Sequence, residues 1–296
     1  MSKPILYTFG PSVWAAVPEL ALIELEYTQD DVEKKVVNLA EGENFAPAFL
    51  KINPQGTLPT LEAGGKAYTS TAEVTSYLVV RASNRVVVAP GTGFIRKIHE
   101  KQYDPNFPKL SARHEDELRS KASGFSMMFL QNRQNALEKH SGTFQGANHR
   151  EFYDAKIAEN GRILSIYQAK APENVKDSFF ECSRTHWNTL KAFILEELPD
   201  ILPESGFLGG DKPGEDDFHL AAWLARIASV AGEDDFHLAA WLARIASVAG
   251  GGDSSKDGAR AIEKELGKPT PEKVVSYWTA WSGRKSWQEV YVNGLH

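Results

Sequence analysis

The first part of the chain alternates short apolar runs with segments of helical periodicity. Residues 4–9 are a mostly apolar run that a Gly-Pro-Ser sequence ends, and a strand is predicted there. Residues 14–25 carry apolar side chains every three or four positions, which predicts a helix in which the early Pro18 is tolerated. A second strand is expected around 36–37 and a short helix at 46–51. This alternation indicates an α/β unit.

A hairpin is predicted next. Two short runs, 60–62 and 66–68, can pair across Gly64-Gly65, a dipeptide that suits a two-residue turn. Pro59 stands at the start of the first run, where a missing N–H is tolerated. A cis bond before Pro59 would turn the N–H and C=O of Leu58 outward, free to pair with an extended peptide.

A helix is predicted to begin directly after the hairpin. The sequence Ser70-Thr71-Ala72-Glu73 fits the capping-box pattern that opens helices. Such a helix end has free N–H groups and the positive end of the dipole, so it attracts a carboxylate. The stretch therefore offers a main-chain edge for a peptide and a helix end for its acidic group.

The rest of the chain shows helical periodicity and no strand pattern. Proline and glycine cluster between the hairpin region and the first long helical segment, which is typical of a linker. The sequence thus predicts an α/β domain at 1–84, a linker at 85–108 and an all-helical domain at 109–296. Within the helical domain, a single long helix is expected at 114–139.

The helical domain contains an identical 18-residue repeat. The segment GEDDFHLAAWLARIASVA occupies 214–231 and again 232–249. Its length is about five helical turns, so the apolar stripe stays in phase between the copies. Gly232 and the acidic residues after it resemble a fresh helix start, and we predict two helices broken near Ala231-Gly232. Only one copy can occupy the centre of the domain, and the sequence leaves open which one, and whether the duplication is natural.

Charge and composition exclude several classes of function. A net charge of −6 over 296 residues gives no basic surface for nucleic acid. The one cysteine, Cys182, excludes an internal disulfide framework and a cysteine-based metal cluster. His114 and His219 show no metal-ligand spacing, so both are expected at the surface or at helix caps. We find neither a secretory pattern nor a membrane-spanning run, and expect a cytoplasmic protein with no metal.

The run Asn53-Pro54-Gln55-Gly56-Thr57-Leu58-Pro59, followed by Ser70-Thr71, resembles a motif of the glutathione transferases, N-P-x-G-x-[VIL]-P and a capping pair. The resemblance continues at 207–217, where the family has G-G-D-x-P-[ST]-x-A-D; Gly214 replaces the capping hydroxyl and Asp217 is retained. The resemblance covers nearly the whole chain. Within the family, the chain is most similar to the fungal-specific A class, which is itself related to bacterial β-etherase-type enzymes. The resemblance implies a thioredoxin-like N-terminal domain, an all-helical C-terminal domain, glutathione as cosubstrate and a homodimer.

The resemblance also implies a glutathione site. Leu58 and Pro59 would align the tripeptide, and Ser70 and Thr71 would hold its carboxylate end. The family usually has Glu or Gln followed by Ser at the capping pair, so Ser70 departs from the pattern and leaves the contact to the γ-glutamyl amino group unassigned.

Activation of the glutathione thiol requires a donor at the start of the first helix. Ser12 is the candidate, because a hydroxyl hydrogen bond and the helix N-terminus both favour the thiolate. In serine- and cysteine-type relatives the active residue often directly precedes the proline of this turn, a place that Gly10 holds here. Tyr7, the counterpart of the residue in tyrosine-type relatives, lies in the apolar run and is interpreted as core. A main-chain N–H is the third possibility.

A flat aromatic ligand would suit an apolar pocket lined by Trp14, Met128, Phe129 and Trp223. Two functions then fit the sequence. The first is a transferase that conjugates or thiolytically cleaves hydrophobic aromatic compounds, with Ser12 stabilising the thiolate. The second is a glutathione-dependent, ligandin-type protein that binds plant-derived aromatics with little turnover.

Overall fold

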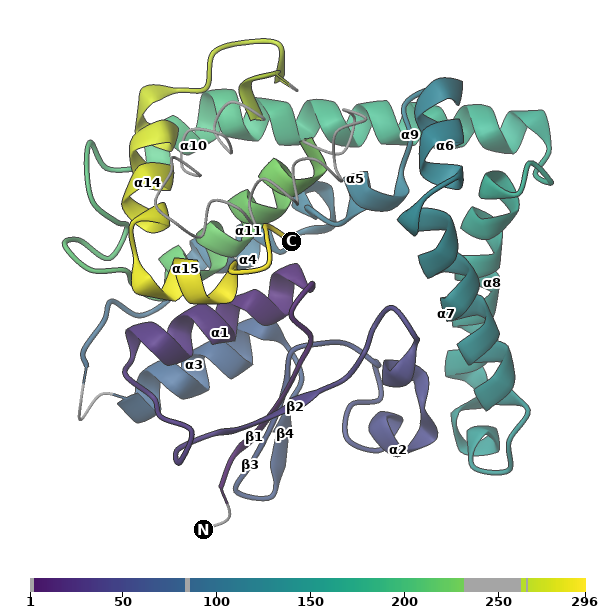
Figure 1. The fold of residues 1–296 in the computed structure, drawn as a ribbon, viewed down its shortest axis with the longest axis horizontal. Coiled ribbons are helices and arrows are strands. Elements are labelled where there is room, and N and C mark those ends of the chain that lie inside the picture. The colour runs from purple at the N-terminus through teal and green to yellow at the C-terminus, as the bar shows by residue number, and fades with distance from the viewer. Residues whose placement is uncertain (1–2, 83–85, 232–261, 265) are drawn as a thin grey trace. The chain divides into compact units, whose positions relative to one another are not determined.

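The computed structural model describes residues 3–82, 86–231, 262–264 and 266–296 (Figure 1). These residues form two compact units, each assembled from segments that are not consecutive in the chain. Unit 1 comprises Met1–Phe9, Glu33–Ser70 and Phe107–Thr185. Unit 2 comprises Gly10–Val32, Thr71–Asn106 and His186–His296.

A four-stranded sheet lies in unit 1. Its strands are β1 (Ile5–Thr8), β2 (Glu33–Val36), β3 (Thr60–Ala63) and β4 (Lys66–Tyr68), in the order β2-β1-β3-β4. β1 pairs parallel with β2, and β3 is antiparallel to both of its neighbours. Gly64 and Gly65 have φ of 59° and 78°, as a two-residue turn of the mirror-image type requires. The predicted first strand and hairpin are confirmed, and the second strand exists but lies at Glu33–Val36, earlier than the expected 36–37. The N-terminal domain is thioredoxin-like.

Helices make up the remainder of unit 1: η1 (Glu43–Phe45), α2 (Pro47–Leu50), α5 (Phe107–Leu110), α6 (Glu115–Ala122), α7 (Phe125–Ser141), η3 (Gly146–His149), α8 (Arg150–Tyr167) and the first part of α9 (Glu173–Ala192). The long helix expected at 114–139 is wrong in one respect, because it is broken between α6 and α7. Gly124 is extended there, with φ −123° and ψ −154°, and Ser123 closes α6 through its hydroxyl on the Ser120 carbonyl. α7 and α8 pack side by side (Figure 1).

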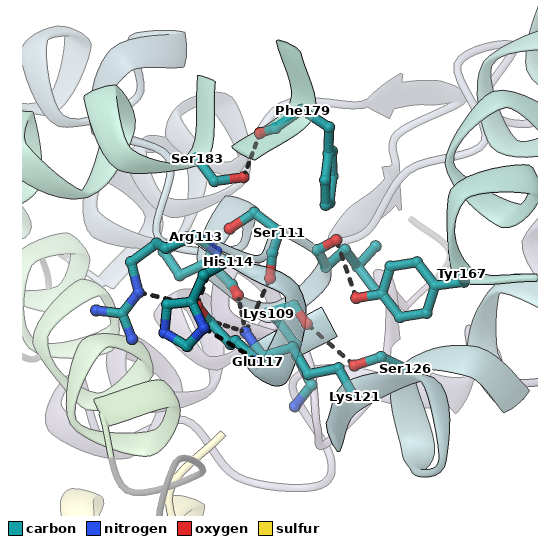
Figure 2. Close-up of polar contacts among 12 residues, drawn as sticks. Lys109, Ser111, Arg113, His114, Glu117, Lys121, Ser126, Tyr167, Phe179 and Ser183 are labelled. Carbon is teal, nitrogen blue, oxygen red and sulfur yellow. Dashed lines mark hydrogen bonds and ion pairs between the residues drawn. The ribbon is translucent and has the colours of Figure 1, made fainter. Parts of the chain in front are cut away.

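A buried ion-pair network fixes the turn between α5 and α6 (Figure 2). Glu117 is 8% exposed and accepts from the main-chain N–H of Arg113 at 2.8 Å and from its Nε at 2.9 Å. Lys121 Nζ donates to Glu117 at 3.0 Å and to the carbonyl of Ser111 at 2.9 Å. Burial opposes the charge of Glu117, but Lys121 and the bonds from Arg113 hold its pKa below the ordinary value.

Among its described residues, unit 2 has helices joined by loops, and its β-structure is an isolated bridge between Phe207 and Gly210. Its elements are α1 (Val13–Glu24), α3 (Thr71–Ala82), α4 (Gly93–Ile98), η2 (Lys101–Tyr103), the end of α9, the π-helical turn η4 (Phe193–Glu197), α10 (Leu198–Ile201), α11 (Glu215–Ala231), α14 (Glu272–Ser282) and α15 (Lys285–Val290). Every residue of α11 is buried, so the first copy of the repeat occupies the centre of this unit. The second copy, 232–249, lies outside the described residues.

The segment predicted to be a linker contains the helices α4 and η2. The acidic first turn of α11 binds the residues just before α4. Glu215 accepts a hydrogen bond from the N–H of Gly91 at 2.8 Å. Asp216 accepts from the N–H and the hydroxyl of Thr92 at 2.9 and 2.7 Å. The domain boundaries at 84 and 109 stay a prediction.

Asp217, which the chain shares with the family pattern, joins three parts of unit 2. Its carboxylate is fully buried and accepts from the main-chain N–H groups of Leu208, Gly209 and Gly214 at 2.8, 2.7 and 2.8 Å. The hydroxyl of Tyr277 donates to the same carboxylate at 2.8 Å. One side chain therefore ties the Gly-Gly loop, the start of α11 and α14 together.

Candidate functional site

Ser12 caps the first helix of unit 2. It has extended backbone angles, φ −101° and ψ 118°, and its Oγ accepts from the N–H of Ala15 at 3.4 Å. A hydroxyl has one donor and two acceptor positions, so this cap leaves the O–H of Ser12 able to donate. The half-buried side chain can therefore be a helix cap and a donor to a thiolate at the same time.

Helix α3 begins in the same unit as Ser12 and packs against α1 (Figure 1). Thr71 is its first residue and is 7% exposed, while Ser70 before it is exposed. The first N–H groups of an α-helix have no partner within the helix, and the dipole makes this end attractive to anions. Two helix N-terminal ends, those of α1 and α3, thus belong to one unit.

The loop before β3, in unit 1, is shaped by a buried asparagine. Asn53 Nδ2 donates to the carbonyl of Thr57 at 2.9 Å and to Oγ1 of Thr60 at 2.9 Å, and Asn53 is fully buried. Gly56 has φ 61°, and a Cβ there would meet the main-chain oxygen of Asn44 at 3.1 Å. The Nδ2 of Asn44 donates to the Gly56 carbonyl at 2.7 Å. These contacts explain the Asn and Gly of the motif, whereas no pattern in the sequence marks Asn44.

Leu58 stands between this loop and the sheet. The Leu58–Pro59 bond is cis, the case in which the main chain of Leu58 is expected from the sequence to face outward. The β1–β3 ladder begins at the pair Tyr7–Thr60, so Leu58 lies outside it. Among the described residues, the main-chain N–H and C=O of Leu58 form no hydrogen bond. Its side chain is buried against Tyr7 and Phe49, which leaves the main chain as the part that can meet a peptide.

Tyr7 is a core residue, as expected. It is 9% exposed, and its hydroxyl donates to Glu62 Oε2 at 2.6 Å. Burial and this bond raise the pKa of Tyr7 to about 12. The hydroxyl proton is therefore committed to Glu62, which disfavours Tyr7 as the donor to a thiol.

The four residues expected to line an aromatic pocket differ in exposure, and two belong to each unit. Trp14, in unit 2, is half-buried and stacks on His99 with ring centroids 4.0 Å apart. Trp223, also in unit 2, is fully buried and donates from Nε1 to the Tyr103 carbonyl at 2.7 Å, so it is a core residue with no surface to offer. Met128 and Phe129 lie on α7 in unit 1, where Met128 is 49% exposed and Phe129 is half-buried.

The expectation that His114 and His219 both lie at the surface or at helix caps is wrong for His219. His114 does cap α6, with Nδ1 accepting from the N–H of Glu117 at 3.4 Å, but His219 is fully buried. Its Nδ1 lies 2.8 Å from Nε2 of His99. Burial lowers the pKa of His99 to about 4 and that of His219 well below its ordinary value. The spacing of four residues between His219 and Trp223 places both on the buried stripe of the helix, a signal that the sequence contained.

One hollow of about 380 Å³ opens beside the β3–β4 hairpin in unit 1. Its lining includes Lys3, Lys51, Glu62 and Lys66, and not Leu58. It is therefore separate from the expected peptide edge. Among the described residues, no group of three or more His, Cys, Asp or Glu side chains could hold a metal ion, and no helix has the length and apolar character needed to cross a membrane.

The N-terminal part of the chain matches a known family, and its fold is similar to that of solved structures. Residues 6–85 match the family described as glutathione S-transferase, N-terminal domain. The solved structure of the beta-etherase LigF from Sphingobium sp. strain SYK-6 aligns over 99% of this chain and 100% of its own, at 16% identity and a TM-score of 0.52. The chain has the glutathione transferase fold.

Two further transferase structures align over most of their length. A glutathione S-transferase from Sinorhizobium meliloti 1021 covers 100% of this chain and 94% of its own, at 16% identity and a TM-score of 0.49. Poplar glutathione transferase F1 covers 98% and 97%, at 13% identity and a TM-score of 0.47. The family match supports the glutathione transferase superfamily, and its span includes every residue expected to bind glutathione.

Proposed function

We propose that this chain is a glutathione transferase that conjugates or thiolytically cleaves hydrophobic aromatic compounds. The observation that carries the proposal is Ser12, whose Oγ caps α1 while its O–H stays available. A thiolate at that point is favoured by a hydroxyl donor and by the helix dipole, and the thiolate is the reactive form.

Glutathione is proposed to bind through main-chain groups. Leu58 offers an N–H and a C=O that form no hydrogen bond within the described residues, suited to the extended backbone of a tripeptide. Pro59 follows Leu58 and directly precedes strand β3. Thr71 offers the N-terminus of α3 to a carboxylate, with Ser70 next to it at the surface.

The proposed chemistry is a nucleophilic displacement. The thiol loses its proton, the sulfur forms a bond to a carbon of the aromatic substrate, and the bond from that carbon to the leaving group breaks. In an aryl ether the leaving group is an aryloxide, which takes up a proton. The aromatic substrate class is supported by Trp14, Met128 and Phe129, whose rings and thioether are partly accessible.

The finer assignments are also proposals. We propose a cytoplasmic homodimer that uses glutathione and no metal, similar to the fungal-specific A class. The second candidate is the ligandin-type protein that binds plant-derived aromatics with little turnover, for which the absence of a side chain at Gly10 is the supporting observation.

The test compares Ser12→Ala with Ser12→Thr, which keeps both the hydroxyl and the helix cap. With 1-chloro-2,4-dinitrobenzene, kcat/KM is expected to fall about tenfold or more in Ser12→Ala and much less in Ser12→Thr. The pKa of bound glutathione, followed by thiolate absorbance, is expected to rise in Ser12→Ala. An unchanged thiol pKa in that variant would assign activation to a main-chain N–H. Aromatic binding without turnover in the wild type would favour the ligandin.

A further inference from the structure

Two cations and three aromatic rings of unit 1 form a row, here called the aromatic ladder: Lys109, Phe125, Phe129, Arg133 and Phe45. Lys109 Nζ lies 5.3 Å from the Phe125 ring, and the Phe125 and Phe129 ring centroids are 5.8 Å apart and stacked. The guanidinium carbon of Arg133 lies 5.2 Å from Phe129 and 4.7 Å from Phe45. Each ring is therefore within cation–π distance of at least one cation.

The geometry of α7 makes this a continuous surface. Phe125, Phe129 and Arg133 are four residues apart, so they lie on one face with a rise of about 6 Å per step. Phe125 is 47% exposed and the neighbouring Met128 is 49% exposed. The Ser126 hydroxyl, donating to the Lys109 carbonyl at 3.0 Å, fixes Lys109 to the start of the same helix (Figure 2).

Arg133 is a charged group in a poorly solvated place. Burial lowers the pKa of its guanidinium to about 10, so it is still cationic at pH 7. Within the described part of the chain, Arg133 forms neither a hydrogen bond nor an ion pair. Glu159, which acts on Arg133 only through its field, is itself paired with Lys156 at 2.8 Å. A guanidinium has five donors arranged to match a carboxylate, and none of these donors has a partner among the described residues.

We propose that the aromatic ladder binds a small aromatic carboxylate, with its ring over Phe125 and Phe129 and its carboxylate on Arg133. A flat ring matches the stacked phenyl faces, and a carboxylate matches the guanidinium in both charge and bidentate geometry. Lys109 at the other end of the ladder adds positive potential. The aromatic class of the ligand rests on the proposed function, whereas the negative charge rests on Arg133 and Lys109 alone.

Cinnamate and its uncharged methyl ester are the probes, titrated by calorimetry into the full-length protein without glutathione. Cinnamate is expected to bind about tenfold more tightly than methyl cinnamate, the scale of one charge-assisted hydrogen-bonded contact. Arg133→Gln is expected to abolish this preference while changing ester binding less than about twofold. Arg133→Lys, which keeps the charge without the planar fork, is expected to keep only part of it.

Arg119→Gln is the matched control, because it removes the same charge from α6, where Arg119 is exposed and pairs with Asp116 at 3.2 Å. It is expected to leave the preference intact. Equal binding of cinnamate and its ester to the wild type would overturn the proposal without requiring any variant to fold. Equal losses in Arg119→Gln and Arg133→Gln would overturn it by showing a general charge effect. Because no glutathione is present, failure here is distinguishable from failure of the transferase assay.

Discussion

Nε2 of His99 and Nδ1 of His219 lie 2.8 Å apart, a hydrogen bond that requires one of the two nitrogens to carry a proton and the other to accept it. His219 belongs to the fully buried helix α11 and His99 follows α4, so the bond joins two elements of unit 2. Trp14 stacks on the outer imidazole, at the start of the helix that Ser12 caps. If each of these two neutral rings gained one more proton, two positive charges would lie in contact inside the unit.

The first prediction is that this pair makes the fold sensitive to acid. Burial lowers the pKa of His99 to about 4, below the value of about 6.5 for an unfolded histidine, and His219 shifts in the same direction. The unfolded state therefore binds more protons between these values, and the free energy of unfolding falls as the pH drops through that window. The shift of the His99 pKa corresponds to an expected loss of about 2–3 kcal/mol between pH 7 and pH 4, and His219 acts in the same direction.

Denaturant unfolding of the wild type and of the double variant His99→Gln, His219→Gln checks this prediction across that pH range. The double variant is expected to be less stable at pH 7, because it loses a buried packing arrangement, yet to have the flatter pH dependence. Parallel pH profiles for the two proteins would show that other groups cause the acid sensitivity.

The second prediction concerns Asp217, which accepts four hydrogen bonds in a fully buried place. Asp217→Asn keeps the shape but turns one acceptor oxygen into an NH₂ group that faces N–H donors. The loss is expected to be about 2–4 kcal/mol in the free energy of unfolding, because buried donors lose their partner. Tyr277→Phe removes only one of the four donors and is the graded control, with an expected loss of about 1 kcal/mol.

Chemical denaturation followed by circular dichroism measures both variants. If Asp217→Asn costs no more than Tyr277→Phe, the three main-chain bonds to the carboxylate contribute little, and the loop before α11 is held by other contacts.

The sequence predicts those parts of the fold whose cause is local. The hairpin turn needs positive φ at two successive positions, and the dipeptide Gly64-Gly65 indicates such a turn in the sequence. The strand β1 and the helix α1 follow from runs and periods within a few residues. The break before α7 is not apparent from the sequence, because the amphipathic pattern continues on both sides of Gly124.

Features that depend on distant partners are harder to predict. His219 has the spacing of a buried residue but the polarity of an exposed one, and only its partner His99, which lies 120 residues away in sequence, resolves the conflict. The linker helix α4 is tied down by Glu215 and Asp216, far along the chain. The candidate glutathione site was predictable as a motif, whereas the role of Asn44 in its loop depends on Gly56 in three dimensions.

The third prediction concerns Gly10. It occupies the position, directly before a proline, at which serine-type glutathione transferases often carry the active residue. Gly10 directly precedes Pro11, it is exposed, and a Cβ built there meets no atom within 4 Å. Its φ lies outside the left-handed region, so a serine can be introduced without backbone strain. Gly10→Ser is therefore expected to fold normally, with a free energy of unfolding within about 0.5 kcal/mol of the wild type.

The informative variant combines Gly10→Ser with Ser12→Ala. If the thiol of glutathione lies within reach of this turn, the new hydroxyl is expected to recover part of the activity that Ser12→Ala loses, and to lower the pKa of the bound thiol again. Gly10→Ala with Ser12→Ala is the matched control, since it adds the same Cβ without a donor. Recovery in both double variants would point to a steric cause, and recovery in neither would mean that the sulfur lies on the Ser12 side of the turn, beyond the reach of residue 10.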